Sequence, residues 1–194
     1  MITIILIFII FTFFILELVY PKSIYLLSFI PSLAFSEPYR FITSLFLHAD
    51  FFHLFFNCWA LFLFGIEIER IIGKLRFLMV FFVSGIVGNI LYMFLSTENI
   101  PAIGASGAIF GIIGTLAILR PSLSLFIFPI LVPIPIIIFA IIYGLYEAIM
   151  SFTHLYESTS IASPAHFGGL IFGIIYGILL RKQRKRKRYL VIWY

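Results

Sequence analysis

Residues 161–188 read IASPAHFGGLIFGIIYGILLRKQRKRKR, an apolar run that is followed at once by seven basic residues. The hydrocarbon core of a bilayer is about 30 Å thick and is crossed by roughly 20 apolar helical residues. Ile161–Leu180 has that length. A basic cluster directly after such a helix is typical of a segment that binds the cytoplasmic membrane surface, and it argues against a nucleic-acid partner. The stretch therefore predicts a membrane helix that ends in the cytoplasm.

The composition of the whole chain points to lipid as its solvent. The 194 residues are 63% hydrophobic and 11% charged, with a mean hydropathy of +1.18. Soluble domains carry roughly 25% charged residues, so too few polar side chains remain here to cover a surface in water. The single cysteine, Cys58, excludes an internal disulfide and is expected to pack in the core.

Five further apolar segments have about the length of a membrane span. They are Ile2–Tyr20, Phe51–Ile68, Phe77–Leu95, Ala102–Leu119 and Leu125–Met150. We therefore expect an all-α membrane protein, with a bundle of six transmembrane helices over residues 1–180 and a basic cytoplasmic tail over residues 181–194. The first segment lacks a basic leader and a cleavage site, so it is interpreted as a retained helix and not as a signal peptide.

Three prolines at the start of the fifth segment, Pro129, Pro133 and Pro135, predict an irregular or kinked beginning. Such a segment is a candidate for a mobile gate.

The distribution of basic residues predicts the orientation. Eleven of the thirteen Lys and Arg residues fall on the side that holds both termini, and only Lys22 and Arg40 fall on the other side. The positive-inside rule then puts both termini in the cytoplasm of a multi-pass protein of the cell membrane. The long connection between Pro21 and Asp50 faces outward, and its mixture of apolar residues and prolines predicts a structured element in the membrane interface.

Three polar residues in different spans are expected at the same depth. Ser106, His166 and Asn57 each lie 13 to 15 residues before a basic residue that marks the cytoplasmic end of the span. At 1.5 Å per residue this is about 20–22 Å, which puts all three in a layer roughly 10 Å beneath the outer surface. His53 lies about one turn above Asn57 and shares its helix face. Polar residues inside the bilayer are expensive, so each is a functional candidate.

Glycines predict which of these helices touch. The fourth and sixth segments carry glycines at short regular spacings: Gly104, Gly107, Gly111 and Gly114 in the fourth, and Gly168, Gly169, Gly173 and Gly177 in the sixth. Small residues at such spacings let helix backbones approach closely in lipid. This packing is expected whatever the function, and it would bring Ser106 within reach of His166.

A serine needs a base within about 3 Å to become a nucleophile, and His166 is the candidate base. Residues 104–107, GASG, lie where a loop becomes a helix, and unpaired backbone N–H groups there suit a developing oxyanion. His53 and Asn57 could complete such an oxyanion hole. A serine alone in a membrane helix is usually a packing residue, and the common depth and the paired glycines favour the catalytic interpretation.

Other chemistries fit less well. No HExxH motif is present, so no metal site and no cofactor are expected. An aspartyl mechanism needs two carboxylates, and Asp50 is the only aspartate. Glu147 is the acid nearest in depth to His166, but it is expected near the outer end of its span and solvated. A Ser–His dyad is therefore preferred to a triad. A small transporter is disfavoured because the polar residues stop in the outer half.

These motifs resemble those of the rhomboid family of intramembrane serine proteases, over essentially the whole chain. The matching residues are GASG at 104–107, like the family's GxSG, AHFGG at 165–169, like AHxxG, His48, His53 and Asn57 at the family's spacing, ERIIG at 69–73, like ExxxG, and Tyr39-Arg40, like Trp-Arg. Tyr39 replaces the common Trp, and Phe110 stands where many relatives have a Tyr, so a hydroxyl is lost there although the ring can still pack on His166.

The resemblance implies a six-helix core that cleaves transmembrane proteins near the outer boundary of the lipid bilayer. Ser106 would be the nucleophile and His166 the base, and His53, Asn57 and the Ser106 N–H would bind the oxyanion. Supporting roles are implied for a further group, which consists of His48, Gly104, Gly107, Phe110, Arg40 and Glu69. A non-catalytic scaffold of the same family is the main alternative.

Overall fold

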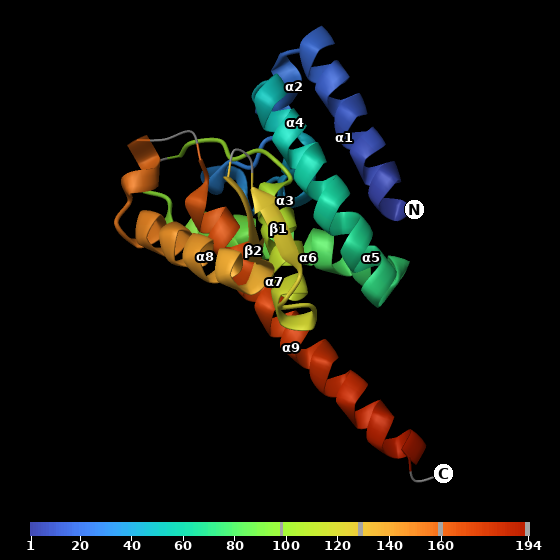
Figure 1. Cartoon of the computed structure of the whole chain (residues 1–194). Coiled ribbons are helices and arrows are strands. Elements are labelled where there is room, and N and C mark those ends of the chain that lie inside the picture. The colour runs from blue at the N-terminus through green and yellow to red at the C-terminus, as the bar shows by residue number, and fades with distance from the viewer. Residues whose placement is uncertain (98, 128–129, 159–160, 193–194) are drawn as a thin grey trace.

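The computed structural model describes residues 1–97, 99–127, 130–158 and 161–192 (Figure 1). Its α-helices are α1 (Ile2–Val19), α2 (Lys22–Leu27), α3 (Arg40–Thr43), α4 (Phe51–Ala60), α5 (Ile66–Ile72), α6 (Lys74–Leu95), α7 (Ser106–Leu119), α8 (Ile136–Phe152) and α9 (Ser163–Ile192). A π-helical turn, Leu61–Gly65, joins α4 to α5, and short 3-10 turns cover Pro31–Leu33, Ser44–Phe46 and Leu155–Ser158. Two strands, β1 (Ser124–Ile127) and β2 (Ile130–Pro135), precede α8.

Four helical segments of the described chain are long and apolar enough to cross a membrane. They are Ile2–Val19, Phe51–Ile72, Lys74–Leu95 and Ser163–Arg184. Two shorter apolar helices, α7 and α8, coincide with the fourth and fifth predicted segments. The prediction of a multi-pass helical membrane protein is therefore confirmed. The count of six crossings stays a prediction, because α7 and α8 are shorter than a standard span.

The all-α prediction is wrong between Ser124 and Pro135, where β1 and β2 form an antiparallel pair. The fifth predicted span began at Leu125, and Leu125 instead pairs with Ile134. The irregular beginning predicted from the prolines is present, but as a strand pair and not as a kinked helix. Proline has no N–H to donate and clashes with the preceding turn of a helix. Pro133 and Pro135 therefore keep this segment extended, and α8 starts directly after the second of them. The third proline, Pro129, lies outside the described residues.

The fourth segment also begins later than predicted. Ala102 is extended, and its backbone exchanges hydrogen bonds of 2.8 and 2.9 Å with Phe29 of the long connection between Pro21 and Asp50. The helix starts at Ser106, after this pairing. The connection itself folds into α2, α3 and 3-10 turns, which confirms the prediction of a structured element between Pro21 and Asp50.

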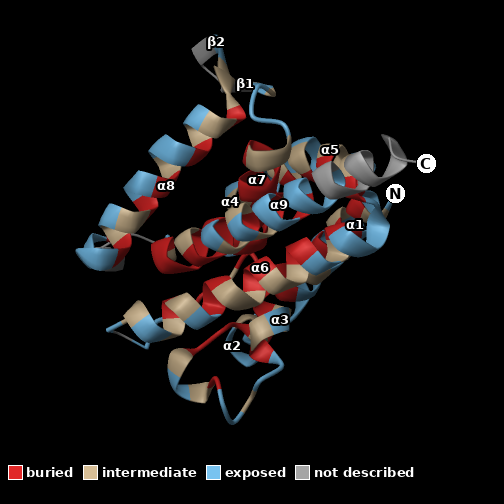
Figure 2. Cartoon of the chain, turned by 90° about the horizontal axis from the view of Figure 1, so that it is seen from below, coloured by how far each residue is buried: buried red, intermediate tan, exposed pale blue. Residues whose placement is uncertain are grey.

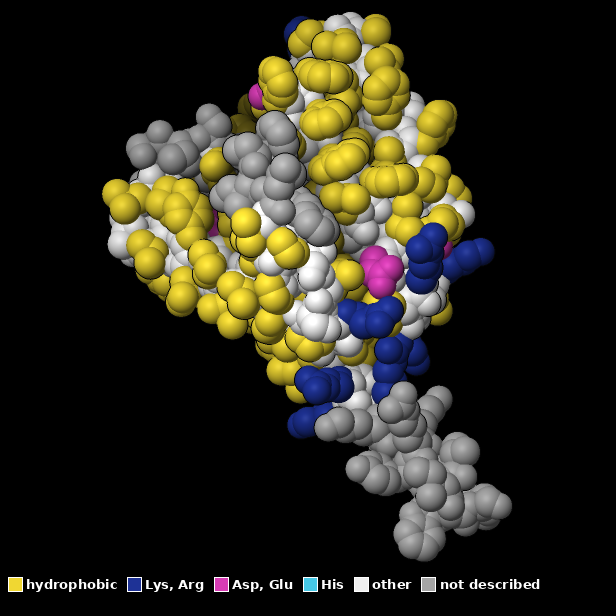
Figure 3. Space-filling model, viewed as in Figure 1, with side chains coloured by type: hydrophobic (Ala, Val, Ile, Leu, Met, Phe, Trp, Pro, Cys, Tyr) yellow, Lys and Arg dark blue, Asp and Glu magenta, His cyan; other side chains and the backbone are white. Residues whose placement is uncertain are grey.

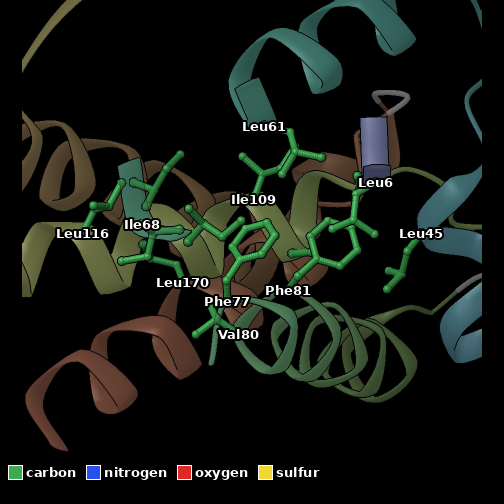
Figure 4. Close-up of a cluster of buried hydrophobic side chains, with 14 of the residues drawn as sticks. Leu6, Leu45, Leu61, Ile68, Phe77, Val80, Phe81, Ile109, Leu116 and Leu170 are labelled. Carbon is green, nitrogen blue, oxygen red and sulfur yellow. The ribbon is translucent and has the colours of Figure 1, made fainter. Parts of the chain in front are cut away.

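Helix α7 lies at the centre of the bundle and is buried along most of its length (Figure 2). It packs most extensively against α9 and also against α6. Its apolar side chains join a cluster that includes Ile109, Leu116, Phe77, Phe81 and Leu170 (Figure 4). A helix that is enclosed by protein does not have to match the thickness of the lipid, which accounts for its short length.

The contact between α7 and α9 is made by backbone. A Cβ atom on Gly169 would lie 1.9 Å from the carbonyl oxygen of Gly107, and one on Gly173 would lie 2.0 Å from that of Gly111. Both distances are shorter than any real contact, so only glycine fits at these two positions of α9. The predicted contact between the two glycine-bearing helices is confirmed.

The surface has the polarity of a membrane protein. Figure 3 shows a largely hydrophobic face, on which nearly all the Lys and Arg side chains gather where α5 ends and α9 leaves the bundle. The exposed basic residues at this end are Arg70, Lys74, Arg76, Arg120, Arg181, Lys182 and Arg184.

We predict that Gly173→Ala lowers the free energy of unfolding by roughly 1–3 kcal/mol, the usual effect of overpacking, because its methyl group would push α9 away from Gly111. Reversible unfolding in mixed detergent micelles measures this. Gly144→Ala is the matched control, since its Cβ would meet only the flexible end of Leu170, at 2.7 Å. Equal losses in the two variants would contradict the backbone contact.

Candidate active site

Ser106 is the first residue of α7 and follows a tight turn. Gly104 has a φ of +117°, which only glycine adopts readily, and its N–H donates to the Ser44 carbonyl at 2.9 Å. The first N–H groups of a helix have no acceptor within the helix. The serine hydroxyl therefore lies beside backbone donors and the positive end of a helix dipole.

His166 lies in the first turn of α9 and is 9% exposed. Its Nε2 atom is 2.7 Å from Ser106 Oγ, a hydrogen-bonding distance. The side chains that the sequence predicted to meet are thus in contact, across the glycine interface between α7 and α9.

The imidazole of His166 is also held by stacking. The ring of Phe110, one turn along α7 from Ser106, lies 4.8 Å from the imidazole centroid at an interplanar angle of 27°. Tyr143 of α8 stacks on the other side of Phe110, with centroids 5.2 Å apart. The predicted packing of Phe110 on His166 is present, and it restricts the plane of the imidazole.

Glu147 is where the sequence interpretation was wrong. It was expected to be solvated, but it is 0% exposed, and its Oε1 lies 2.9 Å from His166 Nδ1. The two imidazole nitrogens therefore contact different helices, Nε2 the serine of α7 and Nδ1 the carboxyl of α8. A dyad was preferred because no acid was expected beside His166. Glu147 is such an acid.

The sequence held a signal for this burial. The buried face of α8 consists of Ile136, Ala140, Gly144, Glu147 and Ser151, which recur at intervals of three or four residues. Small residues at this spacing mark a helix face that packs closely on a neighbour. Since Glu147 lies on that face, it points into the bundle and not toward the membrane surface.

His53 and Asn57 lie on one face of α4, as predicted. The Ala49 N–H donates to His53 Nδ1 at 3.4 Å, which leaves His53 Nε2 as the N–H donor of a neutral ring. A Cβ on Gly104 would lie 2.8 Å from that Nε2 and 3.7 Å from Ser106 Oγ, so both groups lie beside the turn. The amide of Asn57 donates to the His53 carbonyl at 2.9 Å, and its buried Oδ1 has no partner among the described residues.

His48 supports His53 from behind. Its ring is fully buried and lies edge-on to the His53 ring, with centroids 4.9 Å apart. The backbone N–H of His48 donates to the buried side chain of Glu17 on α1 at 3.2–3.3 Å. The arrangement links the C-terminal end of α1 to the start of α4.

Arg40 cross-links the long connection between Pro21 and Asp50. It is 2% exposed and donates to the carbonyls of Tyr25 and Ser28 at 2.8 Å. It also pairs with Glu37 at 2.7 Å, and hydrogen bonds from Tyr39 and then Arg40 keep the pKa of the Glu37 carboxyl below its usual value. Ser28 precedes Phe29, which pairs with Ala102, so the contacts of Arg40 continue through the backbone to a point two residues before Gly104.

Two other predicted residues have structural contacts. Glu69 accepts hydrogen bonds from the Ile2 and Thr3 N–H groups, each at 2.9 Å, and so fixes the start of α1. Gly107 packs against the backbone of Ala165, whose oxygen would lie 3.1 Å from a Cβ at position 107. Within the described ranges, no three His, Cys, Asp or Glu side chains gather as a metal site would require.

Comparison with known proteins gives a match over most of the chain. The family model described as the Rhomboid domain matches residues 36–183. Rhomboid-like protease 1 of Toxoplasma gondii is 32% identical over 164 residues, which are 84% of this chain and 53% of that protein. YdcA of Bacillus subtilis (strain 168), named as a candidate rhomboid protease, is 49% identical over 78 residues, or 40% of this chain and 39% of that protein.

A relative named as inactive is also similar. Inactive RHOMBOID-like protein 8 of Arabidopsis thaliana is 42% identical over 80 residues, which are 41% of this chain and 22% of that protein. The matched regions thus cover 22–53% of the length of these three relatives. Activity has to be argued from the site.

We predict that Gly104→Ala slows the reaction of Ser106 with a fluorophosphonate by at least about tenfold, because a methyl group there displaces the His53 ring or the serine turn; a tenfold effect corresponds to about 1.4 kcal/mol. Mass spectrometry of the labelled peptide measures the rate. Gly73→Ala is the matched control, since Gly73 also has a positive φ, +83°, but nothing lies within 4 Å of its Cβ position. If both variants react at the wild-type rate, the crowding at Gly104 has no role.

Proposed function

The chain belongs to the rhomboid family, and from that premise we propose that it is an intramembrane serine endopeptidase that cleaves transmembrane proteins near the outer membrane boundary. Ser106 is the nucleophile and His166 is its general base. The observation that carries the proposal is the 2.7 Å contact between Ser106 Oγ and His166 Nε2 at the start of a buried helix. A serine that is packed for structure alone does not need a base at that position.

The reaction runs through an acyl-enzyme. His166 Nε2 takes the Ser106 proton while Oγ attacks the carbonyl carbon of the scissile peptide. His166 then gives that proton to the leaving amine, and the C–N bond breaks. Water from the outer face attacks the ester with His166 again as base, which releases the new carboxyl end and restores the serine.

Three donors beside Ser106 support oxyanion stabilisation. They are the His53 Nε2–H, which lies beside Gly104 as Ser106 does, the Ser106 N–H, and, as a proposal, the second N–H of the Asn57 amide, whose first donates to the His53 carbonyl. Donors that are fixed before the reaction stabilise charge as it develops, and in a site with little water they act strongly. His48, Arg40 and Gly104 support this layer by holding His53 and the GASG turn.

The substrate is a membrane helix that unwinds near the cut, because a helical backbone is already paired internally. Small or helix-breaking residues at the cut suit the narrow space beside Ser106. A cavity of about 10 Å³ adjoins the serine, and its lining includes Gly85, Ala102, Ala162 and Ala165.

The proposed orientation follows from the basic residues at one end of the bundle. Both termini lie in the cytoplasm, and the site opens outward. The cell membrane is the proposed location, and α8, which follows the proline-rich hairpin, is the proposed gate.

A non-catalytic scaffold is the competing function, because one relative is named as inactive.

We predict that wild-type protein in liposomes cleaves at least one member of a panel of single-span proteins. Ser106→Ala should lower the cleavage rate by at least about 10³-fold, since removal of a serine nucleophile has effects of this size or larger. Mass spectrometry of the products measures both the rate and the cut.

Ser36→Ala, at an exposed serine of the outer connection, is the matched control and should cleave as the wild type does. Cleavage by Ser106→Ala at the wild-type rate would rule out the nucleophile. A wild-type protein that neither cleaves the panel nor reacts with a fluorophosphonate at Ser106 would favour the scaffold.

A further inference from the structure

Glu147 is a buried acid that the proposed reaction does not yet use. It belongs to α8, it is 0% exposed, and its Oε1 is 2.9 Å from His166 Nδ1. We propose that Glu147 is a positioning residue for His166, so that the site works as a hydrogen-bonded series Ser106–His166–Glu147 and not as a dyad. This inference rests on the proposed function and adds a residue to it.

The carboxylate determines which nitrogen of His166 carries the proton. When Glu147 is ionised, its carboxylate only accepts hydrogen bonds, and Nδ1 is then the N–H donor at this contact. In the neutral ring Nε2 then has a lone pair, and it faces Ser106 Oγ at 2.7 Å. This is the tautomer that a general base needs in order to take the serine proton.

The stacking partner cannot make the same selection. The Phe110 ring stacks on the imidazole. A rotation of the imidazole by 180° about its Cβ–Cγ bond keeps the plane of the ring and leaves the stacking area almost unchanged. Stacking therefore fixes the plane of the ring but not the position of its nitrogens. A hydrogen bond at Nδ1 does fix that position, and Glu147 Oε1 is the acceptor there.

The burial of Glu147 argues for a functional reason to keep it. A carboxylate in the low dielectric of a membrane protein is costly unless it is paired. Oε1 contacts His166, whereas Oε2 is buried without a hydrogen-bond partner among the described residues. A glutamine or an aliphatic residue would fill the same space at lower cost. When His166 accepts the serine proton, the imidazolium and the carboxylate form a neutral pair, so the buried negative charge is compensated at that step.

A purely structural role would give a different set of effects. The face of α8 that carries Glu147 also packs through Gly144 on Leu170, so Glu147 could serve only to attach α8 to α9. In that case replacing Glu147 would lower the stability of the protein, and the reactivity of Ser106 would fall only to the extent that α8 separates from α9. A positioning role predicts lost reactivity and an altered His166 tautomer in a protein that is still folded.

The test compares Glu147→Gln, which keeps the shape and removes the charge, with Glu147→Asp, which keeps the charge on a side chain one CH2 shorter. The rate of Ser106 labelling by a fluorophosphonate is measured in the full-length protein, together with Tm. We expect Glu147→Gln to slow the labelling of Ser106 by at least about tenfold. The equivalent change in a soluble serine protease lowers kcat by roughly 10⁴-fold. Glu147→Asp should label at a rate between those of Glu147→Gln and the wild type. The Tm of Glu147→Gln should be no lower than that of the wild type. Ser151→Ala is the matched control, because Ser151 lies on the same buried face of α8 and donates only to the Glu147 carbonyl, at 2.6 Å.

A second readout does not depend on activity. In protein labelled with ¹⁵N-histidine, the His166 signal is assigned by its loss in His166→Ala and reports which ring nitrogen is protonated. The Nδ1–H form is expected in the wild type, and the Nε2–H form should increase in Glu147→Gln. Wild-type labelling by the glutamine variant, or an unchanged Nδ1–H form in it, would overturn the proposal. If the wild-type serine does not react at all, the proposed function fails, and the tautomer experiment still decides the role of Glu147.

Discussion

The contact between Ser106 and His166 depends on the close approach of α7 and α9. Gly169 and Gly173 bring the backbone of α9 against the carbonyls of Gly107 and Gly111, where any side chain would collide. Side chains at the N-terminal ends of the two helices then meet without a spacer, and Ser106 Oγ comes to 2.7 Å from His166 Nε2. In lipid there is little hydrophobic drive to bring helices together, so packing of small residues has to supply it. The same contact thus provides the stability of the bundle core and the geometry of the site.

The buried position of α7 explains how polar groups are accommodated in such an apolar chain. Because α7 is enclosed by its neighbours, Ser106 begins a helix inside the protein and not against lipid. His166 has partners on two other elements, Ser106 of α7 and Glu147 of α8. Moving α8 would separate Glu147 from His166, so a gate formed by α8 would also control the orientation of the base.

Much of this could be predicted from sequence, since straight helices convert residue counts into depth. Counting from Arg120 and Arg181 put Ser106 and His166 in one layer, and the glycines indicated that their helices touch. The prolines indicated an irregular start of the fifth span, but the strand pairing at Ser124–Pro135 was not predicted, because prolines exclude a regular helix without specifying what replaces it. Glu147 was missed because its distance along the helix suggested solvent, whereas the direction of its side chain depends on which face of α8 packs. That direction was indicated by Ala140, Gly144 and Ser151, but it needs the neighbouring helix to be certain.

The central claim is that the contact between the α7 and α9 backbones makes Ser106 reactive. The most direct measurement is the rate of Ser106 labelling by a fluorophosphonate in Gly169→Ala, compared with Gly177→Ala. A Cβ at Gly169 would lie 1.9 Å from the Gly107 carbonyl, one residue from the serine, whereas a Cβ at Gly177 would meet Ile118 and Thr115 at the other end of α7. The account predicts at least a roughly tenfold slower reaction, or about 1.4 kcal/mol, in Gly169→Ala and a nearly unchanged rate in Gly177→Ala. Wild-type reactivity in Gly169→Ala would contradict it.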